Sequence, residues 1–509
     1  MGTRNVFLCR INATVMFAIL LSLSGIGSST AQTTWNCGSP NVADVVATLD
    51  GDTLTVSGKG FMQNFTLNAP WYDSRNSIRA VKVLNGVTSI GNNAFKNCIG
   101  ITYVSIGNDV QTIGSWAFMD CSGLTDIVIP NSVTSLGQYA FQNSGVISLT
   151  IGTSLKNISA SAFFNCKRLA DLTVPDNVTG IEDRAFMGCE ALISVNFGNN
   201  LYQIGFSAFD GCSNLTSLII PNSVTSIGNT AFNRCSSLES LTIGNQLTSI
   251  GLLTFAYTTN LKSVTIPGNV KTIGKSAFFY SGLESVILEN GITKIDESAF
   301  SGCANLTSVA VPNSVLTIEY SAFSDCENLV SVSFEDGLTI IGNQCFIRCK
   351  NLTSITIPKT VTVVGQSSFS FCVNITKVTN LNPVPQSLNE NLSAFSGVDI
   401  SKDTLYVPDA SVDAYKQSPV WKDFGKILPL SASANTDVPS SKAVTYIYDN
   451  RLYISSIFAE DISVYSLSGS LIYNTKKETG DIVFDIARAL GQVLIVKGSS
   501  GWSKKVAVQ

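Results

Sequence analysis

A phenylalanine that follows a small residue recurs along this chain at an almost constant spacing of 23 residues. The series has two shorter steps of 22 residues and runs through Phe95, Phe118, Phe141, Phe163, Phe186, Phe209, Phe232, Phe255, Phe278, Phe300, Phe323, Phe346 and Phe369. An aliphatic residue stands five positions before each phenylalanine, and another follows it by five or six positions. A unit this short cannot bury its own apolar side chains, so the copies must stack against one another. The sequence therefore predicts a solenoid.

Each repeat also contains a short stretch with strand character, such as Leu218 to Ile220 or Val264 to Ile266. Alternation with a period of two predicts a strand with one buried face. Thirteen coils that each add one strand to a parallel sheet, about 4.8 Å apart, would form a rod of about 60 Å. Glycine four positions before many of the phenylalanines, as at Gly114 and Gly228, predicts a turn with positive φ or a close backbone approach.

A second period of two coils lies on top of the first. The residue that closes the strand is proline at positions 130, 175, 221, 267, 312 and 358, and the coils between them end in Gly107, Gly152, Gly198, Gly244, Glu289 and Glu335. Duplication of a two-coil unit is the simplest cause. Because proline offers no amide hydrogen to a ladder, alternate strands are expected to end differently at the same edge of the sheet.

These repeats carry the consensus I-G-x-x-A-F-x-x-C-x-x-L-x-x-L-x-I-P, read from Ile204 to Pro221 and again from Ile227 to Leu241. The consensus resembles the BspA-like, or treponemal-type, leucine-rich repeat. Leu54 to Gly60 with Pro70-Trp71 resembles the amino-terminal cap of such proteins, and Leu405 to Pro408 with Ala414 to Lys416 and Trp421 to Phe424 resembles their closing segment. The resemblance covers roughly residues 37 to 430. It implies an exported surface protein used in adhesion or in contacts with host or neighbouring cells, with no activity common to all members.

The two ends of the chain have a different character. Arg4 and Arg10 precede a short apolar run and small residues, which predicts a signal peptide over residues 1–31 rather than a retained membrane helix.

After a small, polar linker, several alternating runs predict a compact antiparallel β-sandwich at the carboxyl-terminal end. This unit resembles the sorting domain of the type IX secretion route at Ile462 to Gly469, Asp485-Ile486, Gly491 to Val496 and Lys504 to Val506. An accessory β domain without a sorting role is the alternative. The predicted organisation is a signal peptide at 1–31, an amino-terminal cap at 32–80, leucine-rich repeats at 81–375, a carboxyl-terminal cap at 376–430, a linker at 431–443 and the β-sandwich at 444–509.

Composition excludes several classes of function. Only 13% of the residues are charged and the formal net charge is −4, so there is no basic footprint for nucleic acid. The chain has no histidine, which removes Ser-His-Asp triads, Cys-His dyads and histidine-ligated metal centres. No Gly-x-Ser-x-Gly elbow is present, and paired carboxylates such as Glu182-Asp183 stand at turns where solvated charge is the ordinary explanation. We therefore expect no catalytic residues, no metal and no cofactor.

Cysteine occupies the third position after phenylalanine in ten repeats, at Cys98, Cys121, Cys166, Cys189, Cys212, Cys235, Cys303, Cys326, Cys349 and Cys372. Stacking would bring neighbours near the separation that a disulfide tolerates. Because Ser144, Thr258 and Ser281 take the same slot, we favour a column of small buried thiols over disulfides. Ligands in a straight line do not form a tetrahedral metal site. Cys37 and Cys345 stand outside the column and receive no assignment.

Strand residues that face away from the core lie eight and ten positions after each phenylalanine and are mostly serine, threonine and small apolar residues. These side chains are either solvent-compatible residues of a sheet or a broad, nearly uncharged contact face, as solenoids often present. The candidate binding residues are Tyr103, Ser194, Asn196, Ser217, Ile219, Ser240, Thr242, Ser263, Thr265, Ser308, Ser331, Ser354 and Thr356.

The hypothesis from the sequence is a protein on the outer surface of a Gram-negative-type bacterium, or secreted from it, that binds other macromolecules. An extracellular-matrix or cell-surface protein is favoured as the partner over a glycan, because aromatic platforms are sparse on the predicted face. The alternative is a structural spacer with no specific ligand, and an enzyme is a third and weaker possibility. No integral membrane span and no nucleic-acid partner is expected.

Overall fold

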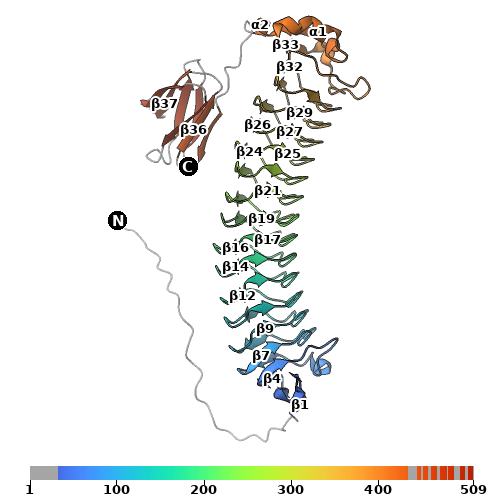
Figure 1. The fold of residues 1–509 in the computed structure, drawn as a ribbon, viewed down its shortest axis with the longest axis vertical. Helices are drawn as coiled ribbons and strands as arrows, with labels where there is room; N and C mark the ends of the chain where they lie inside the picture. Colours follow the sequence, from blue (N-terminus) through green and yellow to red (C-terminus); the bar gives the residue numbers. More distant parts are fainter. Residues whose placement is uncertain are drawn as a thin grey trace, which may run out of the picture.

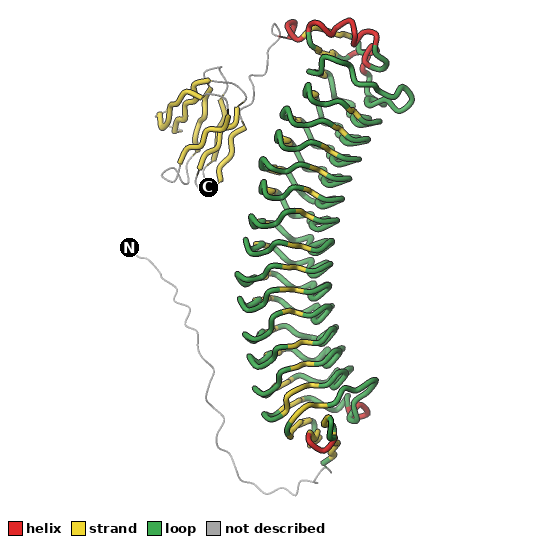
Figure 2. Tube along the Cα trace, viewed as in Figure 1, coloured by secondary structure: helices red, strands yellow, loops and turns green. Residues whose placement is uncertain are grey.

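The computed structural model describes residues 32–433 and seven strands between residues 444 and 507. The predicted signal peptide, and residues 434–443 of the predicted linker, lie outside the described residues. Residues 32–433 form an elongated stack of coils that is mostly loop and short strand, with little helix (Figures 1 and 2). In this described part of the chain no helix is both long enough and apolar enough to cross a bilayer. The predicted solenoid with a parallel sheet along one side is confirmed.

One side of the stack carries the longer strands, which we call the long-strand sheet. Its strands are β4 (Thr53–Gly58), β6 (Ala80–Val83), β8 (Tyr103–Ile106), β10 (Asp126–Val128), β12 (Ser148–Thr150), β14 (Asp171–Thr173), β16 (Ser194–Asn196), β18 (Ser217–Ile219), β20 (Ser240–Thr242), β22 (Ser263–Ile266), β24 (Ser285–Leu288), β26 (Ser308–Val311), β28 (Ser331–Phe334), β30 (Ser354–Ile357) and β32 (Lys377–Asn380). All the pairs between consecutive coils are parallel, and they join residues one repeat apart, such as Ser217 with Ser240.

A second side carries shorter strands, and all but the first contain the aliphatic residue five positions before a repeat phenylalanine. These strands are β5 (Gly60–Met62), β7 (Val87–Ile90), β9 (Thr112–Ile113), β11 (Ser135–Leu136), β13 (Asn157–Ile158), β15 (Gly180–Ile181), β17 (Gln203–Ile204), β19 (Ser226–Ile227), β21 (Ser249–Ile250), β23 (Thr272–Ile273), β25 (Lys294–Ile295), β27 (Thr317–Ile318), β29 (Ile340–Ile341) and β31 (Val363–Val364). Their pairs are again parallel and, apart from a shift between β5 and β7, in register, as between Ile204 and Ile227. The two-residue strands satisfy the hydrogen-bonding groups of the backbone where the chain turns back toward the core.

The core is a continuous column of phenylalanine rings along the axis of the stack. Successive rings are stacked nearly parallel, with centroids 5.2 Å apart between Phe118 and Phe141 and 5.7 Å apart between Phe232 and Phe255. The column continues past the predicted repeats to Phe395, and Trp71 and Trp421 close its two ends. The thirteen predicted phenylalanines are all fully buried. The prediction that like side chains line up along one axis is therefore confirmed.

The third side of each coil is a tight double turn around the phenylalanine. The residues two positions before and two positions after it have positive φ in every repeat, for example φ 57° at Arg184 and φ 74° at Gly188. Their amides donate to the next coil, as from Arg184 N to Phe206 O at 2.8 Å. The glycines four positions before phenylalanine do not have positive φ; they allow close approach, since a Cβ at Gly228 would lie 2.4 Å from Phe206 N. Of the two roles predicted for those glycines, only the close approach is correct.

Strand pairing in the long-strand sheet alternates with the period of the proline pattern. Each strand that ends at a proline pairs with the next strand over three or four residues, as β18 does with β20 and β22 with β24. A strand that ends at glycine or glutamate pairs with the next described strand through one residue, as β16 does with β18, or does not pair with it at all, as for β20 and β22. Glu289 N donates to Ile266 O at 3.0 Å, which is a bond that proline in the same slot cannot make. The predicted difference between alternate strand ends is confirmed.

Both ends of the stack are closed by irregular segments. The amino-terminal segment contains β1 (Thr33–Asn36), β2 (Gly38–Ser39), β3 (Val45–Asp50) and the short 3-10 helices η1 (Val42–Asp44) and η2 (Tyr72–Ser74). The carboxyl-terminal segment contains η3 (Ile400–Lys402), β33 (Thr404–Val407), η4 (Asp409–Ser411), α1 (Val412–Gln417), η5 (Trp421–Asp423), β34 (Lys426–Pro429) and α2 (Leu430–Ser433). Within it, β33 and β34 extend the long-strand sheet beyond β32, again in parallel. The indole of Trp71 donates to Ala94 O at 2.8 Å and that of Trp421 donates to Gln386 O at 2.9 Å, so each terminal ring is also hydrogen bonded.

The carboxyl-terminal unit consists of two antiparallel sheets. One has the order β35-β36-β39 and the other β38-β37-β40-β41. The strands are β35 (Val444–Tyr448), β36 (Arg451–Ser456), β37 (Glu460–Ser466), β38 (Leu471–Lys477), β39 (Gly480–Asp485), β40 (Val493–Gly498) and β41 (Ser503–Ala507). Two antiparallel sheets agree with the predicted small β-sandwich.

Candidate functional site

The outward side chains of the long-strand sheet form the candidate site, which we call the long-strand face. Along β18 the pattern is exposed, buried, exposed, so Ser217 and Ile219 face solvent while Leu218 packs inside. The predicted residues all lie on this face, and all are exposed except the half-buried Ser194, Thr265 and Ser331. Ile219 is 64% exposed, which is high for an isoleucine in a sheet. The face thus combines hydroxyl groups with apolar side chains that the fold leaves uncovered.

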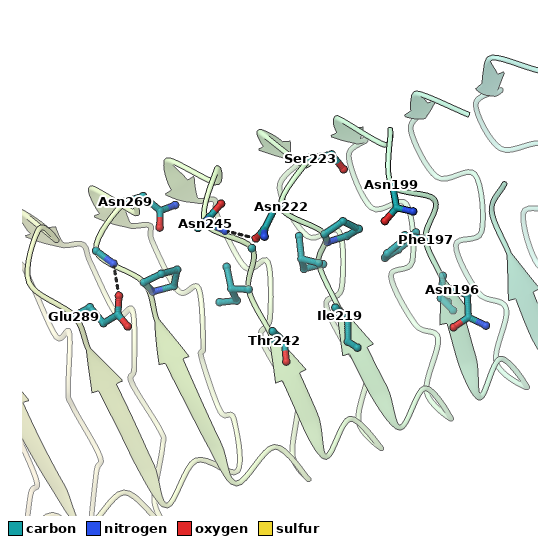
Figure 3. A pocket seen from close by; sticks show the side chains of 17 residues that line it. Asn196, Phe197, Asn199, Ile219, Asn222, Ser223, Thr242, Asn245, Asn269 and Glu289 are labelled. Carbon is teal, nitrogen blue, oxygen red and sulfur yellow. Dashed lines mark hydrogen bonds between the residues drawn. The ribbon is translucent and has the colours of Figure 1, made fainter. Parts of the chain in front are cut away.

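A groove of about 940 Å³ runs along the upper part of this face, where the strands end (Figure 3). It crosses five successive coils, from Val195 to Glu289, and so follows the axis of the stack. Its lining includes Ile219, Pro221 and Pro267 and the side-chain amides of Asn199, Asn222, Asn245 and Asn269. Asn196 and Thr242 project into it from the strands.

A second, smaller groove of about 280 Å³ lies beside it on the same strands. The two grooves bring together six residues of the predicted set, and Thr242 lines both grooves. The predicted residues that line one groove or both are Asn196, Ile219, Ser240, Thr242, Ser263 and Thr265, together with the unpredicted Ile287 of the same column. The remaining predicted residues lie on the same face outside the grooves: Tyr103, Ser194, Ser217, Ser308, Ser331, Ser354 and Thr356.

The larger groove is almost uncharged. Among its 17 lining residues the only charged side chain is Glu289, whose Oε2 accepts a hydrogen bond from Gly268 N at 3.0 Å (Figure 3). Asn222 Oδ1 likewise accepts from Asn245 N at 3.0 Å. These two bonds join neighbouring coils, and the Glu289 carboxylate keeps its negative charge at one end of the groove. The rest of the lining offers neutral amide, hydroxyl and apolar contacts.

The turn that follows each strand was missing from the predicted site. Phe197, Asn199, Asn222, Asn245 and Glu289 line the groove but lie beyond the two outward columns on which the prediction was built. The signal that could have located them is the alternation of proline and glycine at the strand end. That alternation changes the strand pairing at Pro221 and Pro267, which is where the groove opens.

The cysteine column is a structural feature of the turn side and lies away from the grooves. The structure describes twelve cysteines, all buried and all as free thiols. Nine column thiols donate to the carbonyl of the phenylalanine in the preceding coil, as from Cys121 Sγ to Phe95 O at 3.1 Å. Ser281 meets the same column through a contact of 3.1 Å between its Oγ and Cys303 Sγ. The slot thus accepts any small donor, which explains why serine and threonine replace cysteine.

The two cysteines that the sequence left unassigned also have structural positions. Cys345 occupies the alanine slot next to Phe346 and is fully buried. Cys37 lies in the amino-terminal segment, where burial raises the pKa of its thiol to about 11. Neither lies at a groove. Among the described residues no group of three or more histidine, cysteine, aspartate or glutamate side chains is arranged to hold a metal ion.

The geometry defines a repeat solenoid with a grooved sheet face whose grooves carry few charged side chains. The profile described as the BspA type leucine-rich repeat region matches residues 67–193, 156–283 and 271–401. These matches together span more than half of the chain. The protein therefore belongs to the BspA-type leucine-rich repeat family. No curated protein matches its sequence.

Several solved structures are similar to this chain. A leucine-rich repeat protein from Bacteroides ovatus has 24% identity and a TM-score of 0.55, over 76% of this chain and 98% of its own. A leucine-rich repeat protein from Eubacterium ventriosum has 28% identity and a TM-score of 0.46, over 71% and 98%. A leucine rich cell surface protein from Faecalibacterium prausnitzii has 22% identity and a TM-score of 0.33, over 76% and 93%. The B. ovatus likeness supports the fold alone.

Proposed function

We propose that this protein is an exported cell-surface protein that binds another protein through its long-strand face. The observation that carries the proposal is the groove of about 940 Å³, which crosses five coils and is lined, apart from Glu289, by amide, hydroxyl and apolar groups. A repeat stack offers a long rigid surface at little entropic cost, because the groove is preformed before the partner arrives. Membership of the BspA-type family is consistent with a binding or adhesion role.

The binding proposal is tested by placing charge on the face. The variant Ser217→Glu with Ser240→Glu adds two carboxylates beside the grooves on exposed strand positions. The matched control, Ser226→Glu with Ser249→Glu, adds the same charge at exposed positions of the short strands on another side. We expect capture of surface or matrix proteins in a pull-down to fall at least about tenfold in the first variant, because burying an unpaired carboxylate at an interface is costly. Equal capture by both variants would favour the alternative, a spacer with no ligand at this face.

The surface location is a separate proposal. It rests on the signal-like residues 1–31 and on the resemblance of residues 444–509 to a type IX sorting domain. Cell fractionation with and without residues 444–509 tests it. We expect the shortened chain to disappear from the outer surface, and equal surface exposure of both chains would remove the sorting role and leave an accessory β domain.

A further inference from the structure

We infer that β1 pairs with β1 of a second copy of this chain, so that two molecules join antiparallel at their amino-terminal sheet edges. The inference goes beyond the proposed function and does not depend on it. Three features carry it: backbone groups of β1 that have no partner, the lack of any device that blunts this edge, and a half-buried tryptophan on the strand.

One edge of β1 is open. The strand is the last one in the sheet β1-β3-β4-β6-β8, and it pairs with β3 alone, antiparallel. The ladder continues to Cys37, whose N–H donates to Val45 O at 2.8 Å. Since hydrogen-bonded residues alternate along an antiparallel pair, the N–H and C=O groups of Thr34 and Asn36 point away from β3. Within the described residues these groups have no hydrogen-bond partner.

Nothing in the sequence of β1 protects this edge. Edge strands are commonly blunted by lysine, by proline or by a bulge, or they are covered by another element. β1 reads Thr-Thr-Trp-Asn and pairs with β3 in unbroken register, so it has none of the first three.

The opposite end of the stack is built differently. Its last strand, β34, contains Lys426 and Pro429, and η4 and α1 pack against it. Lysine, proline and covering elements are the usual means of keeping an edge from pairing. The amino-terminal edge lacks the first two, so it keeps the character of a strand that another strand completes.

A second β1 satisfies this edge. We place Thr34 of one copy opposite Asn36 of the other, in antiparallel pairing about a two-fold axis. Residues opposed in this way exchange both of their hydrogen bonds, and the axis repeats the pair on its other side. All the open groups of Thr34 and Asn36 in both copies are then used. The edge is thus complementary to itself in donors and acceptors.

The same register brings the two copies of Trp35 together. Trp35 is half-buried, and its ring meets that of Trp71 edge to face with centroids 6.1 Å apart. Across the new edge the two Trp35 residues form a non-hydrogen-bonded pair, in which side chains come closest. Cross-strand aromatic pairs stabilise antiparallel sheets. A second copy therefore supplies this contact, whereas an unrelated strand would need its own aromatic residue at the same place.

The joined sheet carries both candidate sites on one side. Opposed residues of an antiparallel pair point to the same face of a sheet, so the two long-strand faces share a side. Two linked sites bind a partner with repeated epitopes more tightly than one site does. This consequence rests on the proposed function, whereas the pairing stands without it. The glutamate variants of the long-strand face test the first, and the experiments below test the second.

Sedimentation equilibrium of the full chain tests the pairing. We expect a reversible dimer over about 1 to 100 μM. Thr34→Pro removes an open N–H that β3 does not use, and an edge strand tolerates proline where the N–H faces solvent. It should raise the dimer dissociation constant at least about tenfold, because the symmetric joint loses this bond twice. Thr34→Ala keeps the N–H and should change the constant less than about threefold.

Two results of this experiment would overturn the inference. One is a chain that stays monomeric over the whole concentration range. The other is an equal effect of Thr34→Pro and Thr34→Ala on the dissociation constant. Circular dichroism and thermal unfolding of both variants check that the fold is kept.

Cross-linking tests the register independently. Thr34→Cys and Asn36→Cys are made as separate variants, and the native cysteines that the structure describes are all buried. Hydrogen-bonded residues of an antiparallel pair have Cα atoms about 5.5 Å apart, which a disulfide can span. With copper phenanthroline as the oxidant, an equimolar mixture of the two variants should give at least about threefold more linked dimer than either variant alone. Equal yields would overturn the inference, as would a monomeric chain whose β1 captures a strand of another protein.

Discussion

At the scale of single residues, the cysteine column behaves as a row of small buried donors. Burial raises the pKa of the Cys166 and Cys303 thiols to about 12, against an ordinary value of 9.0. The folded chain therefore holds the neutral thiol. Stability from this source is complete below about pH 9 and is lost as the pH rises from 9 toward 12.

This behaviour predicts a pH dependence. We expect the urea midpoint to fall between about pH 8 and about pH 10, and to fall less in Cys303→Ser, which keeps a donor for Phe278 O but has no thiol to ionise. Alkylation by iodoacetamide at about pH 8 should modify the column thiols only after unfolding, because the thiolate is the reactive form. Rapid alkylation of the native protein, measured by mass spectrometry, would contradict the assignment.

The left-handed residues of the turn side lead to a second prediction at this scale. Ser276 has φ 54° and lies two positions before Phe278. Ser276→Gly should be neutral or stabilising by up to about 1 kcal/mol, since glycine adopts this conformation without strain. Ser276→Val should destabilise by about 1 kcal/mol or more, because a branched Cβ fits it poorly. Ser249→Val, at an exposed strand position, is the control and should be close to neutral in chemical denaturation.

At the scale of elements, the ladder depends on which residue closes each strand. Glu289 contributes twice: its N–H donates to Ile266 O at 3.0 Å and its carboxylate accepts from Gly268 N at 3.0 Å. Glu289→Pro removes both bonds and should cost about 2–3 kcal/mol, whereas Glu289→Gly keeps the N–H and should cost about 1 kcal/mol. Urea unfolding measures both. Equal losses would show that the backbone bond at this slot does not support the pairing of β22 with β24.

At the scale of the whole molecule, stability passes from coil to coil through the phenylalanine column. Phe209 stacks on Phe186 and Phe232, with both centroids 5.3 Å away, so Phe209→Ala opens a cavity in the middle of the rod. We expect a loss of about 3–5 kcal/mol and, because each coil contacts only its neighbours, separate unfolding of the two halves. Phe209→Leu fills more of the cavity and should keep a single transition in calorimetry. A single transition in Phe209→Ala as well would show that coupling does not run through this column.

Much of this architecture was predictable because the same sequence pattern recurs in every coil. The spacing of the phenylalanines predicted a stack of coils, and the alternation of Pro221, Gly244 and Pro267 predicted unequal strand ends. A residue repeated in every coil must occupy an equivalent place in every coil, so these predictions needed no tertiary information. The outward columns of the long-strand face followed from the same logic.

The tertiary structure alone decided three other features. The left-handed residues beside each phenylalanine include arginine, leucine and threonine, so no residue type marks them, and only the hydrogen bonds to the next coil hold them. The closing rings at Trp71 and Trp421 depend on contacts outside the repeat. The groove combines side chains from five coils that are far apart in sequence, and its depth depends on how the strand ends separate. The sequence by itself determined what every coil shares, because repetition encodes it; the tertiary structure decided how neighbouring coils differ, because that depends on packing across the stack.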